Sequence, residues 1–273
     1  MDSGTEFTLC IYNTQMRPVL DNTYHKAKRI AAKVNKFDLV CLQECFAHDE
    51  LLVSKSSHKH KVNPEKKRNC FTLVDSGLIT LGNFDLITSY FEVYDAFSSF
   101  QDAIASKGLL MTRWNINGCI VDIYDTHMQA AADNDNDLAA TRKQAKQLVK
   151  AVKTYTPPEH GLIICGDFNM GPYRPGKTNA QLLPTPPYTD DKMMINKTTS
   201  FGVIFDGLKM SDVEDIIRPG TYDGYDRCLF RNGTKVKFTP KAIDWDRTSF
   251  VDEDNKQLSD SFPIIVKMLV TRR

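Results

Sequence analysis

Four short apolar segments that end in polar side chains constrain the fold of this chain more than any other feature. They are residues 7–13 (FTLCIYN), 38–44 (DLVCLQE), 119–127 (CIVDIYDTH) and 162–169 (LIICGDFN). Apolar runs of this length with polar ends are typical of strands that are buried in a sheet. We therefore predict that these segments form the centre of a layered sheet core.

Helical patterns and further strands fill the sequence between these segments. Apolar residues recur at helical spacing within 24–34 and again within 138–152, which predicts one helix at each place. Residues 75–81 and 84–95 are predicted to be two strands that pair with each other across Gly82-Asn83.

The remaining sequence completes a single predicted α/β domain over residues 1–273. Residues 171–200 contain five prolines and little periodicity, so we expect a loop and irregular structure around a short helix there. Short strands are expected from about 219 to 250 and at 261–270. The sequence shows no repeat of fixed period and no low-complexity linker.

Composition excludes several classes of protein. The chain has 35 basic and 34 acidic side chains and a formal net charge of +1, which argues against nucleic-acid binding over its whole surface. It has no run of 18 apolar residues, so any contact with a membrane would be peripheral. Its start lacks a signal-peptide pattern. The seven cysteines form no CxxC pair, and reduced, structural cysteines in a soluble protein favour a cytoplasmic location.

Polar side chains gather where the predicted strands end. They are Asn13, Glu44, His127, Asp167, Asn169, Asp244 and Asp260. Carboxylates that meet at one edge of a core repel one another unless a hard divalent cation lies between them. Glu44 and Asn13 offer oxygen ligands that Mg²⁺ takes, whereas His127 suits a proton donor or a hydrogen-bond donor to an oxyanion. Such a site would hydrolyse a phosphate ester, although each residue alone would equally fit a solvated loop or a turn.

Six motifs resemble those of the endonuclease/exonuclease/phosphatase superfamily, in the same order: YNTQ, DLVCLQE, DTHMQA, ICGDFN, AIDW and SDSFP. The resemblance implies a four-layered α/β sandwich of the DNase I-like type, with two central sheets flanked by helices. It also implies a metal-dependent phosphodiesterase or phosphatase.

The resemblance implies a role for most of the clustered residues. Asn13 and Glu44 match the positions that hold the essential Mg²⁺ of the family. His127 matches the histidine that stabilises the pentavalent transition state. Asp167 and Asn169 match the pair beside the scissile phosphate, which positions the attacking water and the phosphoryl oxygens.

The chain departs from the family at Ser261. The family sequence is Ser-Asp-His-aromatic-Pro, and residues 259–263 read SDSFP. Asp260 matches the acid before the family histidine, and Asp244 matches the acid that orients it. That histidine is the general base that takes a proton from water, a role that a serine hydroxyl cannot fill near neutral pH. Loss of a general base costs about 10²–10⁴ in rate.

Three explanations for Ser261 are consistent with the sequence. The serine is an engineered inactivation, or a natural loss has left a non-catalytic protein that binds phosphoesters or a protein partner. In the third explanation another group, such as Asp167 acting through water, serves as the base.

Within the superfamily the chain is most similar to the neutral sphingomyelinase branch. ASKGLL (105–110) resembles the Lys-Gly motif of that branch, which implies that Lys107 binds substrate together with Asn169. DTHMQA resembles its NTHLQA motif, and RKQAKQL (142–148) resembles the helix that follows. The branch cleaves sphingomyelin to ceramide and phosphocholine with Mg²⁺.

The expected partner is therefore a phospholipid or another phosphodiester. The basic segment 56–69 would suit a peripheral contact with anionic headgroups, although a solvated loop has the same composition. A nuclease of the same fold is the alternative within the enzymes, and nucleic acid is the less expected substrate because the net charge is near zero. The sequence predicts no oligomeric state.

Overall fold

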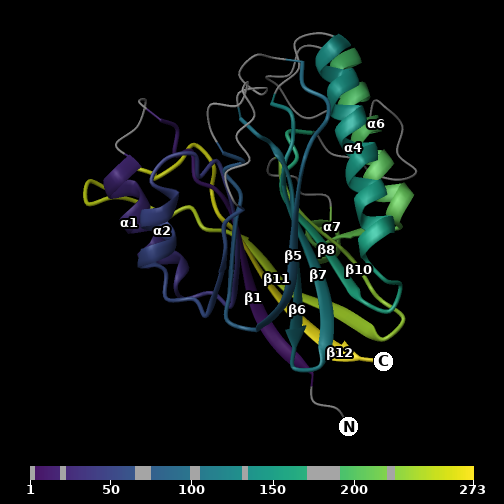
Figure 1. Cartoon of the computed structure of the whole chain (residues 1–273), viewed down its shortest axis with the longest axis horizontal. Helices are drawn as coiled ribbons and strands as arrows, with labels where there is room; N and C mark the ends of the chain where they lie inside the picture. Colours follow the sequence, from purple (N-terminus) through teal and green to yellow (C-terminus); the bar gives the residue numbers. More distant parts are fainter. Residues whose placement is uncertain are drawn as a thin grey trace.

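A computed structural model of the chain has two six-stranded sheets packed face to face, with helices on both outer surfaces (Figure 1). It describes residues 4–18, 23–64, 75–98, 105–130, 135–170, 191–219 and 225–273. The helices are α1 (Thr23–Val34), α2 (Asp49–Lys55), α4 (Asp135–Tyr155), α6 (Asp191–Leu208) and α7 (Val213–Ile217). The predicted four-layered α/β sandwich is confirmed, whereas its limitation to a single domain over 1–273 stays a prediction.

The first sheet has the strand order β11-β12-β1-β2-β4-β3. Its strands are β1 (Thr5–Asn13), β2 (Leu39–Gln43), β3 (His60–Val62), β4 (Ile79–Gly82), β11 (Val236–Trp245) and β12 (Ile264–Arg272). β1 is antiparallel to β12 and parallel to β2, so that Asn13 and Gln43 are register partners. The C-terminal ends of β1 and β2 therefore lie at the same edge.

The second sheet has the strand order β5-β6-β7-β8-β10-β9. Its strands are β5 (Asp85–Val93), β6 (Gly108–Ile116), β7 (Cys119–His127), β8 (Gly161–Asp167), β9 (Ser211–Asp212) and β10 (Asp226–Arg231). β7 and β8 are parallel, as the crossover helix α4 between them requires, and His127 lies opposite Asp167. β10 is antiparallel to β8, and Asp226 also lies opposite Asp167.

The alternation of side chains along the strands divides the core into three apolar layers. Ile11 of the first sheet packs between the sheets together with Ile123 and Ile163 of the second. The outer face of the first sheet packs on α1 through residues such as Ile30, and that of the second sheet packs on α4 through residues such as Leu148. Burial of each such side chain contributes about 1.5–3 kcal/mol to folding.

The predicted pairing of 75–81 with 84–95 is wrong. β4 pairs with β2 and β3 in the first sheet, while β5 pairs with β6 in the second. Because both edges of β4 already have a neighbour, no edge of it is free for β5. The chain instead crosses from one sheet to the other at Asn83 and Phe84, and Phe84 packs against the core between the sheets.

The helix predicted within 171–200 is longer than expected. α6 extends over Asp191–Leu208 and packs beside α4 (Figure 1). Residues 171–190 and the side chains of 191–199 lie outside the described part of the structure.

Six cysteines are free and buried: Cys10, Cys41, Cys45, Cys119, Cys165 and Cys228. The prediction of reduced, structural cysteines is confirmed for these six, and Cys70 lies outside the described residues. Among the helices that are described, none combines the length and the apolar character needed to cross a bilayer.

Candidate active site

Inward-facing residues from both sheets meet at one edge of the sandwich. The alternation that buries apolar residues between the sheets also brings Asn13, Gln43, His127 and Asp167 to that side. Two hydrogen bonds join the sheets there. Nδ2 of Asn13 donates to Oδ2 of Asp167 at 3.1 Å, and Nε2 of Gln43 donates to Oδ1 of Asp125 at 2.6 Å.

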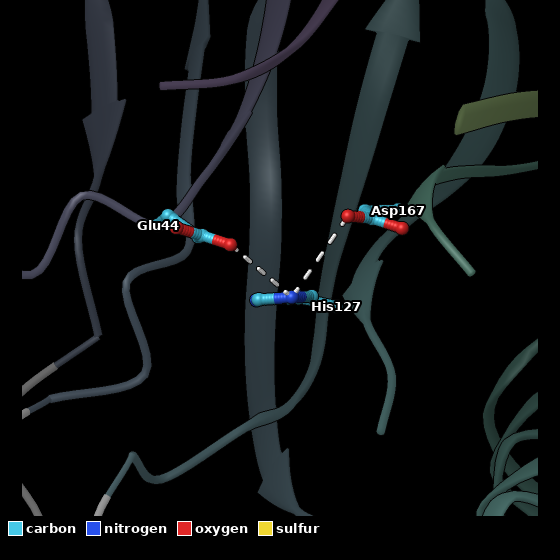
Figure 2. A group of neighbouring side chains, drawn as sticks. All are labelled: Glu44, His127 and Asp167. Carbon is cyan, nitrogen blue, oxygen red and sulfur yellow. Dashed lines mark ion pairs between the residues drawn. The ribbon is translucent and has the colours of Figure 1, made fainter. Parts of the chain in front are cut away.

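Glu44, His127 and Asp167 form a compact group at this edge (Figure 2). Nε2 of His127 is 3.7 Å from Oε1 of Glu44 and 4.0 Å from Oδ2 of Asp167. One potential ligand atom from each residue lies within 4.8 Å of the other two. The His127 side chain is 2% exposed, whereas Glu44 and Asp167 are 20% and 10% exposed, so solvent reaches the carboxylates more than the imidazole.

The Asn13 amide links the two carboxylates of this group. Its Nδ2 donates to Oε1 of Glu44 at 3.0 Å as well as to Asp167, and its Oδ1 accepts the backbone N–H of Gln15 at 3.1 Å. Asn13 thus holds a carboxylate from each sheet in place. Its predicted role as a metal ligand stays a prediction, because its amide oxygen faces Gln15 in this arrangement.

The backbone is unusual where the strands end. Gln15, Glu44 and Asn169 have φ values of 49°, 55° and 50°, in the left-handed region that non-glycine residues adopt at a cost. Gly166, the residue before the last residue of β8, has φ 122°, and a Cβ there would lie 2.1 Å from the carbonyl oxygen of Thr126. The glycine of the GDFN motif is therefore required by the close approach of β7.

Burial sets the charge states of the group. Desolvation raises the pKa of Glu44 and of Asp167, and the hydrogen bonds from Asn13 and the charge of Lys107 oppose this shift. Burial, followed by the charge of Lys107, lowers the pKa of His127 well below its usual value. The imidazole is therefore neutral at pH 7, while both carboxylates are in an environment that disfavours their charged forms.

Lys107 and Asn169, the two predicted substrate-binding residues, contact the same carbonyl group. Nζ of Lys107 and Nδ2 of Asn169 each donate to the oxygen of Met128 at 3.1 Å. The backbone N–H of Asn169 also donates to Oδ1 of Asp167 at 2.8 Å. Lys107 is 4% exposed, so the site contains a buried cation beside the carbonyl group of Met128.

The segment around Ser261 is tied to the end of β1. Oγ of Ser259 donates to the carbonyl of Asn13 at 2.7 Å, and Nε2 of Gln15 donates to Oδ2 of Asp260 at 2.6 Å. The backbone N–H of Ser261 donates to Oγ of Ser259 at 3.3 Å. The charge of Asp260 raises the pKa of both clustered carboxyl groups, which places this acid within electrostatic reach of the site.

The structure does not bring Asp244 to this cluster. Asp244 is exposed on β11, between Ile243 and Trp245, which both face the core between the sheets. The register of β11 shifts between Pro240 and Ala242, and such a bulge reverses which residues face inward. Asp244 therefore points to the opposite face of the sheet.

Asp226 is a residue of this edge that the motif analysis missed. It is half-buried, it lies opposite Asp167, and its Oδ1 is buried without a hydrogen-bond partner in the described structure. Burial, followed by the charges of Asp167 and Glu44, raises its pKa well above the usual value. Most of the predicted site residues follow the C-terminal end of a strand. Asp226 is the first residue of an antiparallel strand, and a search that included such positions would have found it.

The donor set at this edge fits a hard divalent cation. Glu44 and Asp167 bring carboxylate oxygens from opposite sheets, and both have a pKa that burial raises, with a further rise from the charge of Asp260. A bound cation would relieve this repulsion, and carboxylate oxygens are ligands that Mg²⁺ prefers.

Comparison with protein families identifies one matching model. It is described as the endonuclease/exonuclease/phosphatase family, and it matches residues 10–245. A putative neutral sphingomyelinase of Drosophila melanogaster is 26% identical over 145 residues, which cover 50% of this chain and 32% of that protein. The match thus spans about a third of the length of that curated relative.

Solved structures with the same fold cover nearly the whole chain. Beta toxin from Staphylococcus aureus has a TM-score of 0.68 and 15% identity, over 95% of this chain and 99% of that chain. Sphingomyelinase C from Streptomyces griseocarneus has a TM-score of 0.66 and 16% identity, over 96% and 99%. D. rerio TDP2, complexed with a single-strand DNA product, has a TM-score of 0.67 and 12% identity, over 97% and 99%. At these identities the likeness establishes the fold alone.

Proposed function

The chain belongs to the endonuclease/exonuclease/phosphatase family, and we propose that it is a Mg²⁺-dependent phosphodiesterase of the sphingomyelinase type. Its phosphodiester substrate is sphingomyelin, which it cleaves to ceramide and phosphocholine. The presence of Ser261 in place of the family's general base strongly impairs turnover in this chain.

The observation that carries this proposal is the convergence of Glu44, His127 and Asp167 from both sheets, with Asn13 between the carboxylates. A group held only for stability would be paired by opposite charges. Here two carboxylates face a neutral imidazole instead, as a site that receives a cation and a phosphate requires.

Glu44 and Asp167 are the residues that would hold the cation. When bound, Mg²⁺ supplies positive charge that polarises a phosphoryl oxygen and offsets the charge of the transition state. Asn13 keeps the two carboxylates at a fixed separation through its hydrogen bonds to both of them. That amide also reduces their repulsion.

The remaining residues act on the phosphodiester. The neutral imidazole of His127 donates a hydrogen bond from Nε2 to a phosphoryl oxygen, on which negative charge grows during the attack of water. The buried cation of Lys107 and the amide of Asn169 stabilise the same charge from the side of Met128. Removing one donor of this kind typically costs about 10²–10³ in turnover.

Ser261 supplies no base for the attacking water. Its segment is nevertheless held in place by Ser259 and Asp260, which bond to the end of β1. A histidine at this position would therefore enter a fixed loop beside an acid, as a general base needs. This anchoring supports the proposal that a histidine at position 261 would serve as the missing base.

The test is Mg²⁺-dependent release of phosphocholine from sphingomyelin vesicles by the chain and by its Ser261→His variant. We expect turnover to rise by about 10²–10⁴-fold in the variant, the usual contribution of a general base. If the variant cleaves DNA but not sphingomyelin, the substrate is nucleic acid and the proposed substrate is wrong. If the variant hydrolyses none of the phosphodiesters tested, the proposed enzymatic activity is wrong, and the protein acts by binding.

Two control variants locate the chemistry in the Ser261→His background. His127→Ala should return turnover to the level of the parent chain, and Glu44→Ala should weaken the Mg²⁺ dependence. Activity that survives the first change would place the catalytic site elsewhere, and an unchanged Mg²⁺ titration after the second would remove Glu44 from the ligand set.

The choice of sphingomyelin is supported by the likeness to the Drosophila putative neutral sphingomyelinase over half of this chain. The ASKGLL segment adds to this support, because its Lys107 is buried beside the group rather than solvated on the surface. Of the basic segment 56–69, residues 65–69 lie outside the described structure, and a peripheral membrane contact through this segment remains a proposal.

A further inference from the structure

We propose that Gln15 is a positioning residue, which fixes the segment of Ser261 relative to Asn13 and so determines where a general base at position 261 would lie. This inference rests on the proposed function and extends it, because the sequence motifs and the proposed mechanism assign no role to Gln15. Three observations support it, namely the hydrogen bonds of its side chain, those of its backbone, and the conformation in which that backbone is held.

The side chain of Gln15 bonds Asp260 at two points. Its Nε2 donates to Oδ2 of Asp260 at 2.6 Å, and its Oε1 accepts the backbone N–H of Asp260 at 3.3 Å. Two parallel hydrogen bonds fix the orientation of a partner as well as its distance. Because Asp260 directly precedes Ser261, this pair restrains the direction in which the side chain of residue 261 leaves the loop.

The backbone of Gln15 is bonded on both sides. Its N–H donates to Oδ1 of Asn13 at 3.1 Å, and its carbonyl oxygen accepts Nζ of Lys26 at 2.8 Å. Each polar atom of Gln15 therefore has a partner. The residue joins Asn13, which lies between the two carboxylates of the site, to Asp260, which lies beside position 261.

The backbone conformation of Gln15 is unfavourable in itself. Its φ is 49°, in the left-handed region that residues with a side chain adopt at a cost. Such conformations persist where the surrounding contacts determine them, and they are frequent at functional sites. Here Lys26, a buried residue of α1, holds the carbonyl group in place. The position of Gln15 is thus determined from the helix layer and not by the loop that it bonds.

A second contact holds the same segment from the inside. Oγ of Ser259 donates to the carbonyl of Asn13 at 2.7 Å in buried surroundings, whereas the pair of Gln15 with Asp260 lies at the surface. The buried bond keeps the loop at the end of β1. Loss of the surface pair should therefore leave the loop attached through Ser259 but allow it to turn about that residue.

The first experiment measures hydrogen exchange at the backbone N–H groups of Asp260 and Ser261, by nuclear magnetic resonance on the full chain. Gln15→Met keeps the length of the side chain and removes both bonds to Asp260, while the backbone bonds of Gln15 remain. We expect exchange at these two groups to become about 10-fold faster, the usual effect of losing a hydrogen bond to a charged group. Unchanged exchange would overturn the proposal.

Gln257→Met is the matched control. Gln257 lies on the loop that precedes this segment, and its Nε2 donates to the carbonyl of Arg247 at 2.7 Å, also at the surface. The substitution removes the same kind of side chain and a bond of similar length, but it leaves the pair with Asp260 intact. Exchange at Asp260 and Ser261 should keep its parent rate. Equal acceleration in both variants would mean a general loosening of the loop and would overturn the proposal.

A reversed pair of side chains gives a rescue. Gln15→Glu places a second carboxylate against Asp260 and should speed exchange as Gln15→Met does. When Asp260→Asn is added, the new amide donates to the new carboxylate, and the pair forms again with the same total charge. The double variant should therefore exchange more slowly than Gln15→Glu alone. A double variant that exchanges as fast or faster would contradict a direct contact between the two side chains.

The second experiment separates this inference from the function on which it rests. In the Ser261→His background, Gln15→Met should lower kcat for sphingomyelin by about 10-fold and leave KM unchanged, because Gln15 holds the base and not the substrate. Unchanged kcat in an active background would overturn the proposal, as would a rise in KM alone. If Ser261→His hydrolyses no phosphodiester, the proposed function fails, and the exchange rates still decide whether Gln15 fixes this segment.

The Tm of each variant shows whether it is folded. Should Gln15→Met not fold, Gln15→Asn gives the same test, because its amide is one methylene closer to the backbone and cannot bond Asp260 at both points. Unchanged exchange at Asp260 and Ser261 in that variant would again contradict the proposal.

Discussion

The space between the two sheets has an apolar part and a polar edge, although the same strands build both. Along β7 the inward residues are Cys119, Val121 and Ile123, and then Asp125 and His127. Four other strands that line this space change in the same way. Ile11 is followed by Asn13 on β1, Cys41 by Gln43 on β2, and Cys165 by Asp167 on β8, while on β10 Asp226 precedes Cys228.

This difference separates what stabilises the fold from what the fold positions. The apolar part contains buried side chains, most of which need no hydrogen-bond partner. Within the described part of the chain, the polar edge has buried atoms without hydrogen-bond partners on Gln43, Asp125, His127 and Asp226. Each such atom reduces the free energy of unfolding by about 1–3 kcal/mol. The polar edge therefore stays folded because the apolar part is well packed. This is the expected pattern when a site is built on a rigid frame.

The largest expected effect is at the apolar part. Ile163→Ala removes a side chain that is completely buried at the centre of the second sheet. We expect the free energy of unfolding to fall by about 2–5 kcal/mol, from lost burial and the cavity that remains. Urea denaturation measures the change. The Mg²⁺ affinity of the folded variant should stay the same, and a loss comparable to that of Glu44→Ala would mean that the two regions are not separable.

A smaller effect is expected from Gln43, which joins the two sheets within the polar edge. Gln43→Leu removes the 2.6 Å hydrogen bond that Nε2 of Gln43 donates to Asp125. Oδ1 of the buried Asp125 carboxyl group then lacks this donor. The free energy of unfolding should fall by about 1–3 kcal/mol.

The double variant Gln43→Leu with Asp125→Leu sharpens this test. Replacing both partners by apolar groups of similar size is often neutral or stabilising, so the double variant should be at least as stable as Gln43→Leu alone. Urea denaturation of all four chains gives the coupling energy. A double variant that loses the sum of two destabilisations would show that the polar edge contributes stability of its own.

The sequence predicted this edge in part. Glu44, His127 and Asp167 lie at the C-terminal ends of clearly apolar strands. Because β1 pairs with β2 and β7 with β8 in parallel, these ends lie at one edge of the sandwich. Asp226 could not be found in the same way, because it begins an antiparallel strand. Asp244 follows only two apolar residues, Ala242 and Ile243, and the bulge near Pro240 turns it to the other face. Such a bulge depends on the pairing of β11 with β12, which the local sequence does not reveal.

The same limit explains the wrong strand pair. The sequence of β4 and β5 resembles a hairpin, yet the two edges of β4 are occupied by β2 and β3. Local patterns predict that a strand exists and which face is apolar. Which strand lies beside it depends on competition among all the edges of the sheets, and this competition is decided only in the folded chain.

The last expected effect concerns pH and Asp125 alone. Burial raises the pKa of Asp125 well above its usual value, with the hydrogen bond from Gln43 opposing the shift. The folded chain therefore binds this proton more tightly than the unfolded chain, in which the pKa is about 3.9. Ionising the buried Asp125 therefore lowers the free energy of unfolding. This loss is absent below pH 3.9 or so, about the pKa in the unfolded chain. It grows as the pH rises toward the pKa in the folded chain and is complete above it.

Asp125→Asn removes this penalty while keeping an oxygen for Gln43. Its free energy of unfolding, minus that of the parent chain, should be positive at pH 8 and decrease steadily toward pH 5, measured by urea denaturation in EDTA. Because Glu44, Asp167 and Asp226 titrate in both chains, the subtraction leaves the contribution of Asp125 together with its coupling to Asp226. A difference that is negative at pH 8, or that grows as the pH falls, would mean that the charged form of Asp125 stabilises the fold. The polar edge would then contribute stability of its own, as the apolar part does, and the contrast between the two regions would not hold.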